Sequence, residues 1–236
     1  MASPGTSTCG GTMPRIARGL NDGFIYHVLN RGNSREEVFH KQGDYYSFVK
    51  LLTESMEQFD VRIFAYCLMP NHFHILVEPE KGEALSKFMQ WLTTCHVRRY
   101  HQHYGTSGHV WQDRFKSFIV QNDVHLLTVA RYIEGNPVRA GLVKSAKDWR
   151  WSSHRDRLKG AGNGTISDLP IALPDAWSSY TDLPLTSIEL EKLRKSVAKR
   201  APFGEEEWVH KTSEQHGLSS TLKGQGRPKK VMKIQS

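Results

Sequence analysis

Residues 61–78 read VRIFAYCLMPNHFHILVE, two apolar runs joined by Pro70 and Asn71. Both runs are rich in β-branched and aromatic residues, which strands favour, and the Pro-Asn pair marks a turn. We therefore predict an antiparallel pair of strands over 61–69 and 72–78. Side chains in a strand alternate between faces, so His72 and His74 share one face and Phe73 points into a core on the other.

Two imidazoles side by side on one sheet face can act as a pair of ligands for a divalent metal. A His-x-His pattern in a strand is, on its own, more often a coincidence than a metal site. The pair gains meaning only if the chain supplies a third ligand and a reacting group.

The flanking sequence predicts the remaining elements of a domain. An apolar run over 24–30 (FIYHVLN) predicts a first strand, and helical spacing of apolar residues predicts two long helices. The order is β-α-β-β-α-β and then α, which matches a ferredoxin-like α+β fold, an antiparallel sheet with helices on one face. The predicted helices cover 44–59, 83–104 and 123–135, and the last strand covers 115–120.

Composition divides the chain further. Residues 1–12 are small and polar and predict a flexible N-terminal extension, and 13–158 form the predicted catalytic domain. A glycine-rich break opens a predicted irregular linker over 159–184. Residues 185–236 then form a small, mostly helical C-terminal extension with a basic tail, whose short helical patterns cover 187–200 and 204–216.

The 236 residues carry a formal net charge of +8 and 38% hydrophobic residues, so we expect a folded core and a polyanionic partner such as nucleic acid. The three cysteines are widely spaced and form no CxxC pair, which disfavours a disulfide framework. No apolar run approaches the roughly 20 residues that span a bilayer. We expect a cytoplasmic, nucleoid-associated protein with no membrane partner.

A candidate reacting group lies some sixty residues after the histidines. Tyr132 and Asn136 are four residues apart in the predicted helix 123–135, so they share a face. Pro137 should end the helix near Asn136, where the tyrosine can swing and the amide oxygen can reach a metal. A phenolate there could attack a phosphate that a bound metal polarises.

Several separated motifs resemble the single-tyrosine HUH transposases, in particular the branch of the REP-associated tyrosine transposases. The matching stretches are His-x-His at 72–74, Tyr-x-x-x-Asn-Pro-Val-Arg-Ala-Gly at 132–141, Trp-Gln-Asp-Arg-Phe at 111–115 and Tyr-His-Val-Leu-Asn-Arg-Gly at 26–32. They occur in the family's order, and the resemblance covers about residues 13–158.

The resemblance implies a role for each matching residue. His72 and His74 would hold Mg²⁺ or Mn²⁺, Tyr132 would be the nucleophile, and Asn136 stands where relatives place a third polar ligand, often glutamine. The implied activity is cleavage and transfer of single-stranded DNA beside a hairpin through a 5′-phosphotyrosine link. The alternative is a non-catalytic DNA-binding regulator on the same scaffold. Members of the family act as monomers or homodimers.

Basic and aromatic residues supply candidate DNA contacts. Arginines and lysines would bind phosphates, and Trp111 and Phe115 could stack on unpaired bases or pack in the core. The tail Gly-Arg-Pro-Lys-Lys (226–230) resembles a minor-groove arm, with a disordered basic tail as the default alternative. The predicted DNA-binding residues are Arg31, Arg35, Arg98, Arg99, Trp111, Arg114, Lys116, Arg139, Arg227, Lys229 and Lys230.

Overall fold

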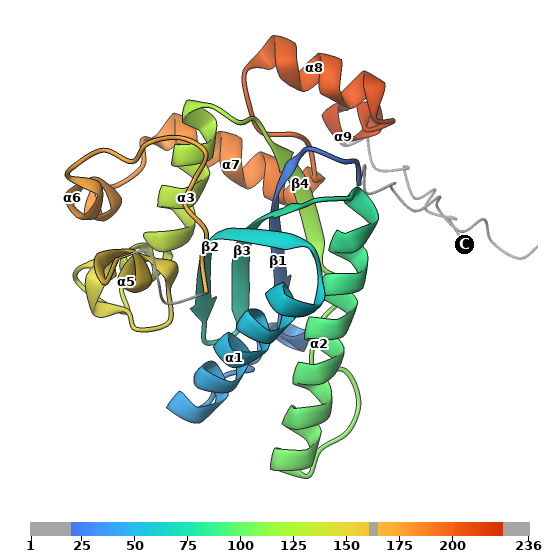
Figure 1. Cartoon of the computed structure of the whole chain (residues 1–236), viewed down its shortest axis with the longest axis vertical. Helices are drawn as coiled ribbons and strands as arrows, with labels where there is room; N and C mark the ends of the chain where they lie inside the picture. Colours follow the sequence, from blue (N-terminus) through green and yellow to red (C-terminus); the bar gives the residue numbers. More distant parts are fainter. Residues whose placement is uncertain (1–19, 161–164, 224–236) are drawn as a thin grey trace, which may run out of the picture.

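A four-stranded antiparallel sheet forms the centre of the protein (Figure 1). The structure, a computed structural model, describes residues 20–160 and 165–223. The spatial order is β2-β3-β1-β4, and each neighbouring pair is antiparallel. This order confirms the predicted fold class. The strands are β1 (Ile25–Arg31), β2 (Val61–Met69), β3 (His72–Pro79) and β4 (Lys116–Val120).

Two long helices, α1 (Gln42–Gln58) and α2 (Gly82–Tyr104), cover one face of the sheet, as predicted. Phe48 of α1 and Phe88 of α2 are fully buried in one apolar cluster with Phe73 of β3. The prediction that Phe73 points into a core is therefore confirmed. Burying large aromatic side chains between the layers is a main source of stability for this half of the fold.

A third helix, α3 (Val124–Glu134), covers the opposite face, so helices lie on both sides of the sheet. Leu126 and Val129 of α3 pack against Leu76, which follows His74 by two residues in β3. Asp123 caps this helix, because its side chain accepts a hydrogen bond from the His125 backbone N–H. The face that carries the histidines is thus the face that α3 covers.

The C-terminal part adds short helices around this core. One of them, α6 (Trp177–Asp182), lies in the stretch predicted to be an irregular linker, and its Trp177 is buried in the cluster under α3. A single buried tryptophan anchors that helix, which the Pro- and Ser-rich composition did not reveal. The others are α4 (Asn136–Arg139), α5 (Ser153–Leu158), α7 (Ser187–Lys199), α8 (Glu206–Gln215) and α9 (Ser219–Leu222), with single turns at Asn33–Arg35 and Ala146–Asp148.

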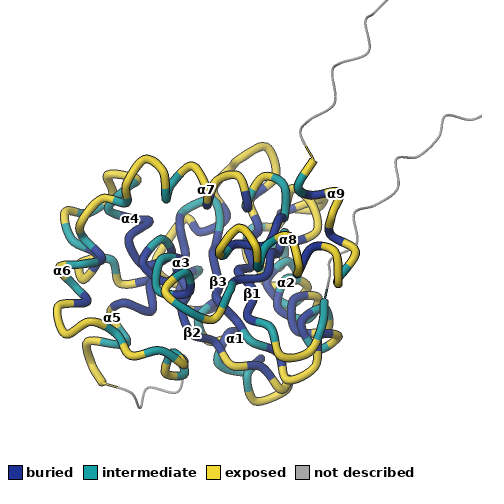
Figure 2. The backbone as a smooth tube through the Cα atoms, turned by 90° about the horizontal axis from the view of Figure 1, so that it is seen from above, coloured by how far each residue is buried: buried dark blue, intermediate teal, exposed yellow. Residues whose placement is uncertain are grey.

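Later segments of the chain cover both edges of the sheet. At β2 the Leu68 N–H donates to the Trp151 carbonyl at 2.9 Å, so the segment around Trp151 packs back onto the sheet. At β4 Phe203 pairs with Val120, and its carbonyl accepts from the Gln121 N–H at 2.9 Å. Figure 2 shows the buried strands in the middle of the molecule with exposed segments around them. Covering the edges hides backbone groups that could otherwise pair with another chain.

In the described part of the chain, no helix is long and apolar enough to cross a membrane. Cys67 and Cys95, the two cysteines in that part, are both free thiols.

Candidate active site

The two predicted metal ligands lie side by side at the start of β3. Their ring centroids are 5.1 Å apart, with His74 only 3% exposed and His72 half-buried. His72 lies opposite Arg31 of β1 and Met69 of β2 in the sheet register. The period-two alternation of the strand therefore places both imidazoles as predicted.

Each histidine has one ring nitrogen engaged and the other left over. The Nδ1 of His72 lies 2.6 Å from Oδ1 of Asn71, and the Nδ1 of His74 lies 2.8 Å from Nε2 of His27. The amide oxygen can only accept, so the His72 proton sits on Nδ1. In both rings Nε2 is the nitrogen left for another partner.

Burial keeps both imidazoles neutral. It lowers the pKa of His72 to about 4, and the charges of Arg31 and Arg139 act in the same direction. Burial, with neighbouring His27 and His72, also lowers the pKa of His74 well below its usual value. A metal ligand must offer a deprotonated nitrogen, so both histidines are in the required state at neutral pH.

Tyr132 lies directly beside this pair. It occupies the last turn of α3, and its ring centroid is 5.7 Å from that of His74 and 6.1 Å from that of His27. The tyrosine is half-buried. The fold thus brings together two sequence motifs that are some sixty residues apart.

Arg139 holds the tyrosine from its other side. Its Cζ lies 4.2 Å from the Tyr132 ring centroid, and its Nη2 donates to the Tyr132 carbonyl at 2.8 Å. Burial lowers the pKa of Arg139, yet a guanidinium keeps its charge in proteins. The sequence predicted a tyrosine free to swing at a frayed helix end, whereas the structure places a cation over its ring. Arg139, predicted as a phosphate contact, is also a partner of the tyrosine.

Asn136 follows immediately. Helix α3 ends at Glu134, and Asn136 begins α4 with Pro137 in its first turn, so the predicted helix boundary is confirmed. The Asn136 side chain is 9% exposed, and its Nδ2 has no hydrogen-bond partner in the described structure. A buried donor without a partner is costly; a substrate oxygen could accept from this Nδ2, whereas only the Oδ1 of the amide could bind a cation. Gly135 has no room for a side chain, because a Cβ there would lie 2.9 Å from the Thr181 carbonyl oxygen.

The donor set fits a hard divalent cation only with help from oxygen ligands. No cluster of three His, Cys, Asp or Glu side chains that could hold a metal occurs in 20–160 or 165–223. Two neutral imidazoles and an amide therefore make up the available protein donors. Substrate phosphate oxygens and water would have to complete the coordination of Mg²⁺ or Mn²⁺.

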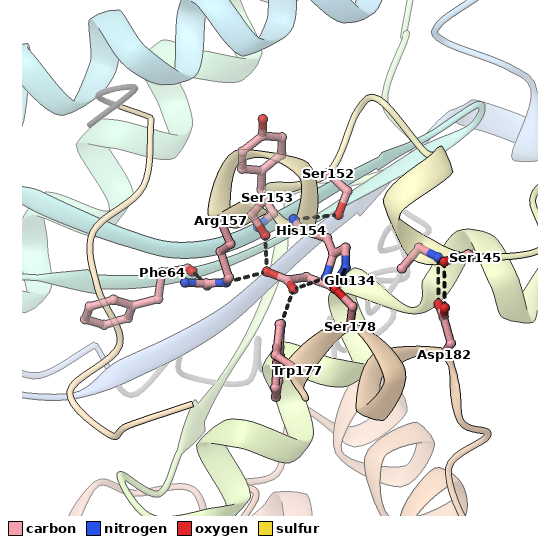
Figure 3. Close-up of polar contacts among 12 residues, drawn as sticks. Phe64, Glu134, Ser145, Ser152, Ser153, His154, Arg157, Trp177, Ser178 and Asp182 are labelled. Atoms are coloured by element: carbon pink, nitrogen blue, oxygen red, sulfur yellow. Dashed lines mark hydrogen bonds and ion pairs between the residues drawn. The ribbon is translucent and has the colours of Figure 1, made fainter. Parts of the chain in front are cut away.

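A buried carboxylate, which the sequence reasoning missed, anchors the helix that carries Tyr132 (Figure 3). Glu134 is fully buried and accepts hydrogen bonds from four side chains. These are Ser153 Oγ at 2.6 Å, Trp177 Nε1 at 2.7 Å, Arg157 Nε at 2.8 Å and His154 Nδ1 at 3.0 Å. We call these five residues the Glu134 cluster; it ties α3 to α5 and α6.

The charge of Glu134 is stabilised within this cluster. Burial opposes ionisation, but the hydrogen bond from His154 and the charge of Arg157 outweigh it and lower the pKa of Glu134 below its usual value. A charged residue within a helix usually faces water, so spacing alone gave no signal of this burial.

Two of the predicted phosphate contacts lie beside the histidine pair. Arg31 is exposed at the end of β1, and the Arg35 carbonyl accepts a hydrogen bond from Asn71 Nδ2 at 2.9 Å. Both therefore flank the turn that leads into His72. Lys116, the first residue of β4, is half-buried opposite Leu29. The others, all exposed, are Arg98 and Arg99 on α2 and Arg114 before β4.

The predicted stacking residues lie in the core instead. Trp111 and Phe115 are each 7% exposed. The Trp111 ring packs against Phe73 and His96, with ring centroids 5.1 Å apart in each case. The packing alternative is therefore the one that the geometry supports. Arg227, Lys229 and Lys230 lie outside the described residues.

Part of the chain is similar to known transposases. Residues 21–136 match the family model described as "Transposase IS200 like". The match includes both histidines, Tyr132 and Asn136. This segment of the chain is similar to IS200-like transposases.

Two relatives and one solved structure are also similar to the chain. A Haemophilus influenzae protein described as a REP-associated tyrosine transposase is 32% identical over 115 residues, which cover 44% of this chain and 65% of the relative. The chain thus spans slightly under two thirds of that protein. The REP-associated tyrosine transposase of Escherichia coli is 25% identical over 143 residues, 60% of this chain and 82% of the relative. A solved REP-associated tyrosine transposase bound to a REP hairpin has a TM-score of 0.48 at 21% identity, covering 71% of this chain and all of the other.

Proposed function

We propose that this protein is a metal-dependent single-stranded DNA endonuclease and strand transferase that cleaves beside DNA hairpins. The observation that carries the proposal is the position of Tyr132, 5.7 Å between ring centroids from the neutral His74. A tyrosine beside two neutral imidazoles places a nucleophile next to a pair of metal ligands. The relatives' names, which refer to REP-associated tyrosine transposases, support a transposase activity, and hairpin DNA as the substrate follows from the resemblance of the sequence motifs.

In this proposal His72, His74 and the amide of Asn136 would hold Mg²⁺ or Mn²⁺. When bound, the cation supplies a Lewis acid that polarises the scissile phosphate. The Nε2 atoms of the histidines would be the ones to hold it, because their Nδ1 atoms are engaged by Asn71 and His27.

Tyr132 then forms the covalent link. Its oxygen bonds to the phosphorus while the bond from phosphorus to the 3′-oxygen breaks, and the phenol proton is lost as a 3′-hydroxyl is released. The product is a 5′-phosphotyrosine. Attack by another 3′-hydroxyl reverses the exchange and frees Tyr132, so strand transfer needs no external energy source. Arg139 orients the ring through its contact with the ring face and its hydrogen bond to the Tyr132 carbonyl.

The surface around His72 supports DNA binding. Arg31 and Arg35 flank the turn before this histidine, whereas the exposed Arg98 and Arg99 lie on α2 and the exposed Arg114 lies before β4. We propose that these arginines bind the phosphate backbone of the hairpin and of its flanking single strand. The tail residues Arg227, Lys229 and Lys230 remain part of the proposal as an accessory DNA arm.

We further propose that the protein acts as a monomer in the compartment that holds chromosomal DNA. Tyr132 and the histidines come from one chain, and residues around Trp151 and Phe203 cover the two sheet edges. Both features argue against an active site shared between two copies. Light scattering on the purified protein, alone and with hairpin DNA, tests this, and a stable dimer would contradict it.

The alternative is a regulator that binds the same DNA without cutting it. Incubation of the wild type with Mn²⁺ and a labelled hairpin-bearing single strand from its own gene's flanks separates the two. The transferase predicts a denaturant-resistant protein–DNA adduct that Tyr132→Phe abolishes while hairpin binding persists. His72→Ala should lose the adduct as well. If the wild type binds the hairpin specifically but forms no adduct, the result would favour the regulator and refute the transferase.

A further inference from the structure

His27 occupies an unusual place for a polar side chain. It is 0% exposed in the middle of β1, and its ring packs edge-on against Phe118 with centroids 4.8 Å apart. One ring nitrogen, Nδ1, has no hydrogen-bond partner in the described structure. A phenylalanine or leucine would fill this apolar space without an unpartnered polar atom, so packing alone does not explain a histidine.

The other nitrogen of His27 reaches the candidate metal ligand. Its Nε2 lies 2.8 Å from His74 Nδ1, and the two rings stack with centroids 5.0 Å apart and planes 27° from parallel. The sheet register explains the contact: His74 is paired with Leu29, so His27 is its diagonal neighbour on the same face. Among residues 20–160 and 165–223, His74 is therefore the one hydrogen-bond partner of the His27 ring.

This hydrogen bond can exist in two tautomeric forms. If His74 donates from Nδ1, its Nε2 keeps a free lone pair, and the proton of His27 rests on Nδ1. If His27 donates instead, the proton of His74 sits on Nε2, where a cation cannot bind. Each ring carries one proton in both forms, so the two differ only in where those protons lie.

We propose that His27 is a positioning residue for His74: it accepts the Nδ1 proton of His74 and so presents the Nε2 lone pair to the cation. This inference rests on the proposed function, because it assumes that His74 binds the metal. Second-layer partners of this kind commonly fix the tautomer and orientation of a ligating histidine. Asn71 fixes the tautomer of His72 in the same way, because its Oδ1 accepts a hydrogen bond from the His72 Nδ1 at 2.6 Å.

Two variants separate positioning from packing. His27→Phe keeps a flat ring beside Phe118 but offers no acceptor, whereas His27→Gln keeps an amide oxygen near the place of Nε2. A matched control is Cys67→Ala, because Cys67 is paired with His74 on the β2 side and removing its sulfur perturbs packing without touching the hydrogen bond.

The measurement is Mn²⁺ affinity of the full chain by electron paramagnetic resonance, with thermal unfolding of each variant as the fold check. His27→Phe should weaken Mn²⁺ binding about 10- to 100-fold, while His27→Gln and Cys67→Ala stay within about threefold of wild type. A purely structural role would lower the melting temperature but leave the affinity of the folded protein unchanged.

Two results would overturn the inference. Equal Mn²⁺ affinity of folded His27→Phe and wild type would show that His27 does not act through His74, with the proposed function intact. Equal weakening in His27→Gln and His27→Phe would show that the acceptor is not what matters. If the wild type has no Mn²⁺ site that His72→Ala removes, the metal assignment itself fails and this inference fails with it.

Discussion

Replacing Glu134 by Gln tests how the nucleophile's helix is held in place. The substitution keeps the shape of the side chain but removes its charge and one of its two acceptor oxygens. Arg157, whose side chain is 9% exposed and whose Nε lies 2.8 Å from the carboxylate, then lacks its counter-ion. Removing one partner of a buried ion pair costs about 3–5 kcal/mol.

We therefore expect Glu134→Gln to lower the free energy of unfolding by about 3–5 kcal/mol at pH 7. For a chain of this size that corresponds to a fall of roughly 6–20 °C in melting temperature. Urea unfolding followed by circular dichroism measures it, and Glu191→Gln at an exposed position of α7 is the matched control. A loss below about 1 kcal/mol, no more than an ordinary hydrogen bond contributes, would refute the reasoning.

The stability of the wild type and that of Glu134→Gln should depend differently on pH. Because the pKa of Glu134 is lower in the folded than in the unfolded state, its charge stabilises the fold above the unfolded-state pKa, about 4.3. That contribution is lost as the pH falls from there through the folded-state pKa. The stability gap between wild type and Glu134→Gln should thus narrow below about pH 4. A gap that is constant or grows in acid would contradict a stabilised carboxylate.

Substitutions at the Tyr132 ring contact, in the core and on the basic surface give further predictions. Arg139→Gln should slow adduct formation about 5- to 30-fold, as expected for losing a contact of about 1–2 kcal/mol with the Tyr132 ring, and single-turnover assays at saturating DNA measure it. Trp111→Ala should cost about 3–5 kcal/mol of stability because the ring lies in the core, and a stable variant with weakened DNA binding would instead favour base stacking. Arg114→Ala should leave stability within about 0.5 kcal/mol and reduce the salt dependence of hairpin binding by about one phosphate contact in a titration over NaCl concentration. Truncation after Lys223 should weaken hairpin binding and flatten its salt dependence, and an unchanged slope would exclude a DNA arm.

The sequence predicted the sheet and the histidine pair because both depend on local patterns. Alternation in β3 fixes which side chains share a face, and the Pro70-Asn71 turn fixes the antiparallel pairing of β2 with β3. The four-residue spacing of Tyr132 and Asn136 likewise follows from helix geometry, and Pro137 explains the boundary between α3 and α4.

The partners of these residues depend on contacts between distant segments, which no local pattern reveals. His27 meets His74 only through the register of β1 with β3, and a lone histidine in a strand carries no sign of it. Glu134 is buried because α5 and α6 supply its donors from 19 to 43 residues further along the chain. The burial of Trp111 follows from the way its segment passes between β1 and α2, whereas the sequence left core packing and base stacking equally open.

The central claim is that Tyr132 itself attacks the DNA phosphate. Peptide mapping by mass spectrometry of the adduct formed with Mn²⁺ and a hairpin-bearing single strand tests it most directly. We predict a nucleotide-modified peptide that contains Tyr132 and depends on His72 and His74. Modification at Tyr100 or Tyr104, the tyrosines that end α2, would contradict the account, as would a modification at Tyr132 that persists after His72→Ala and His74→Ala.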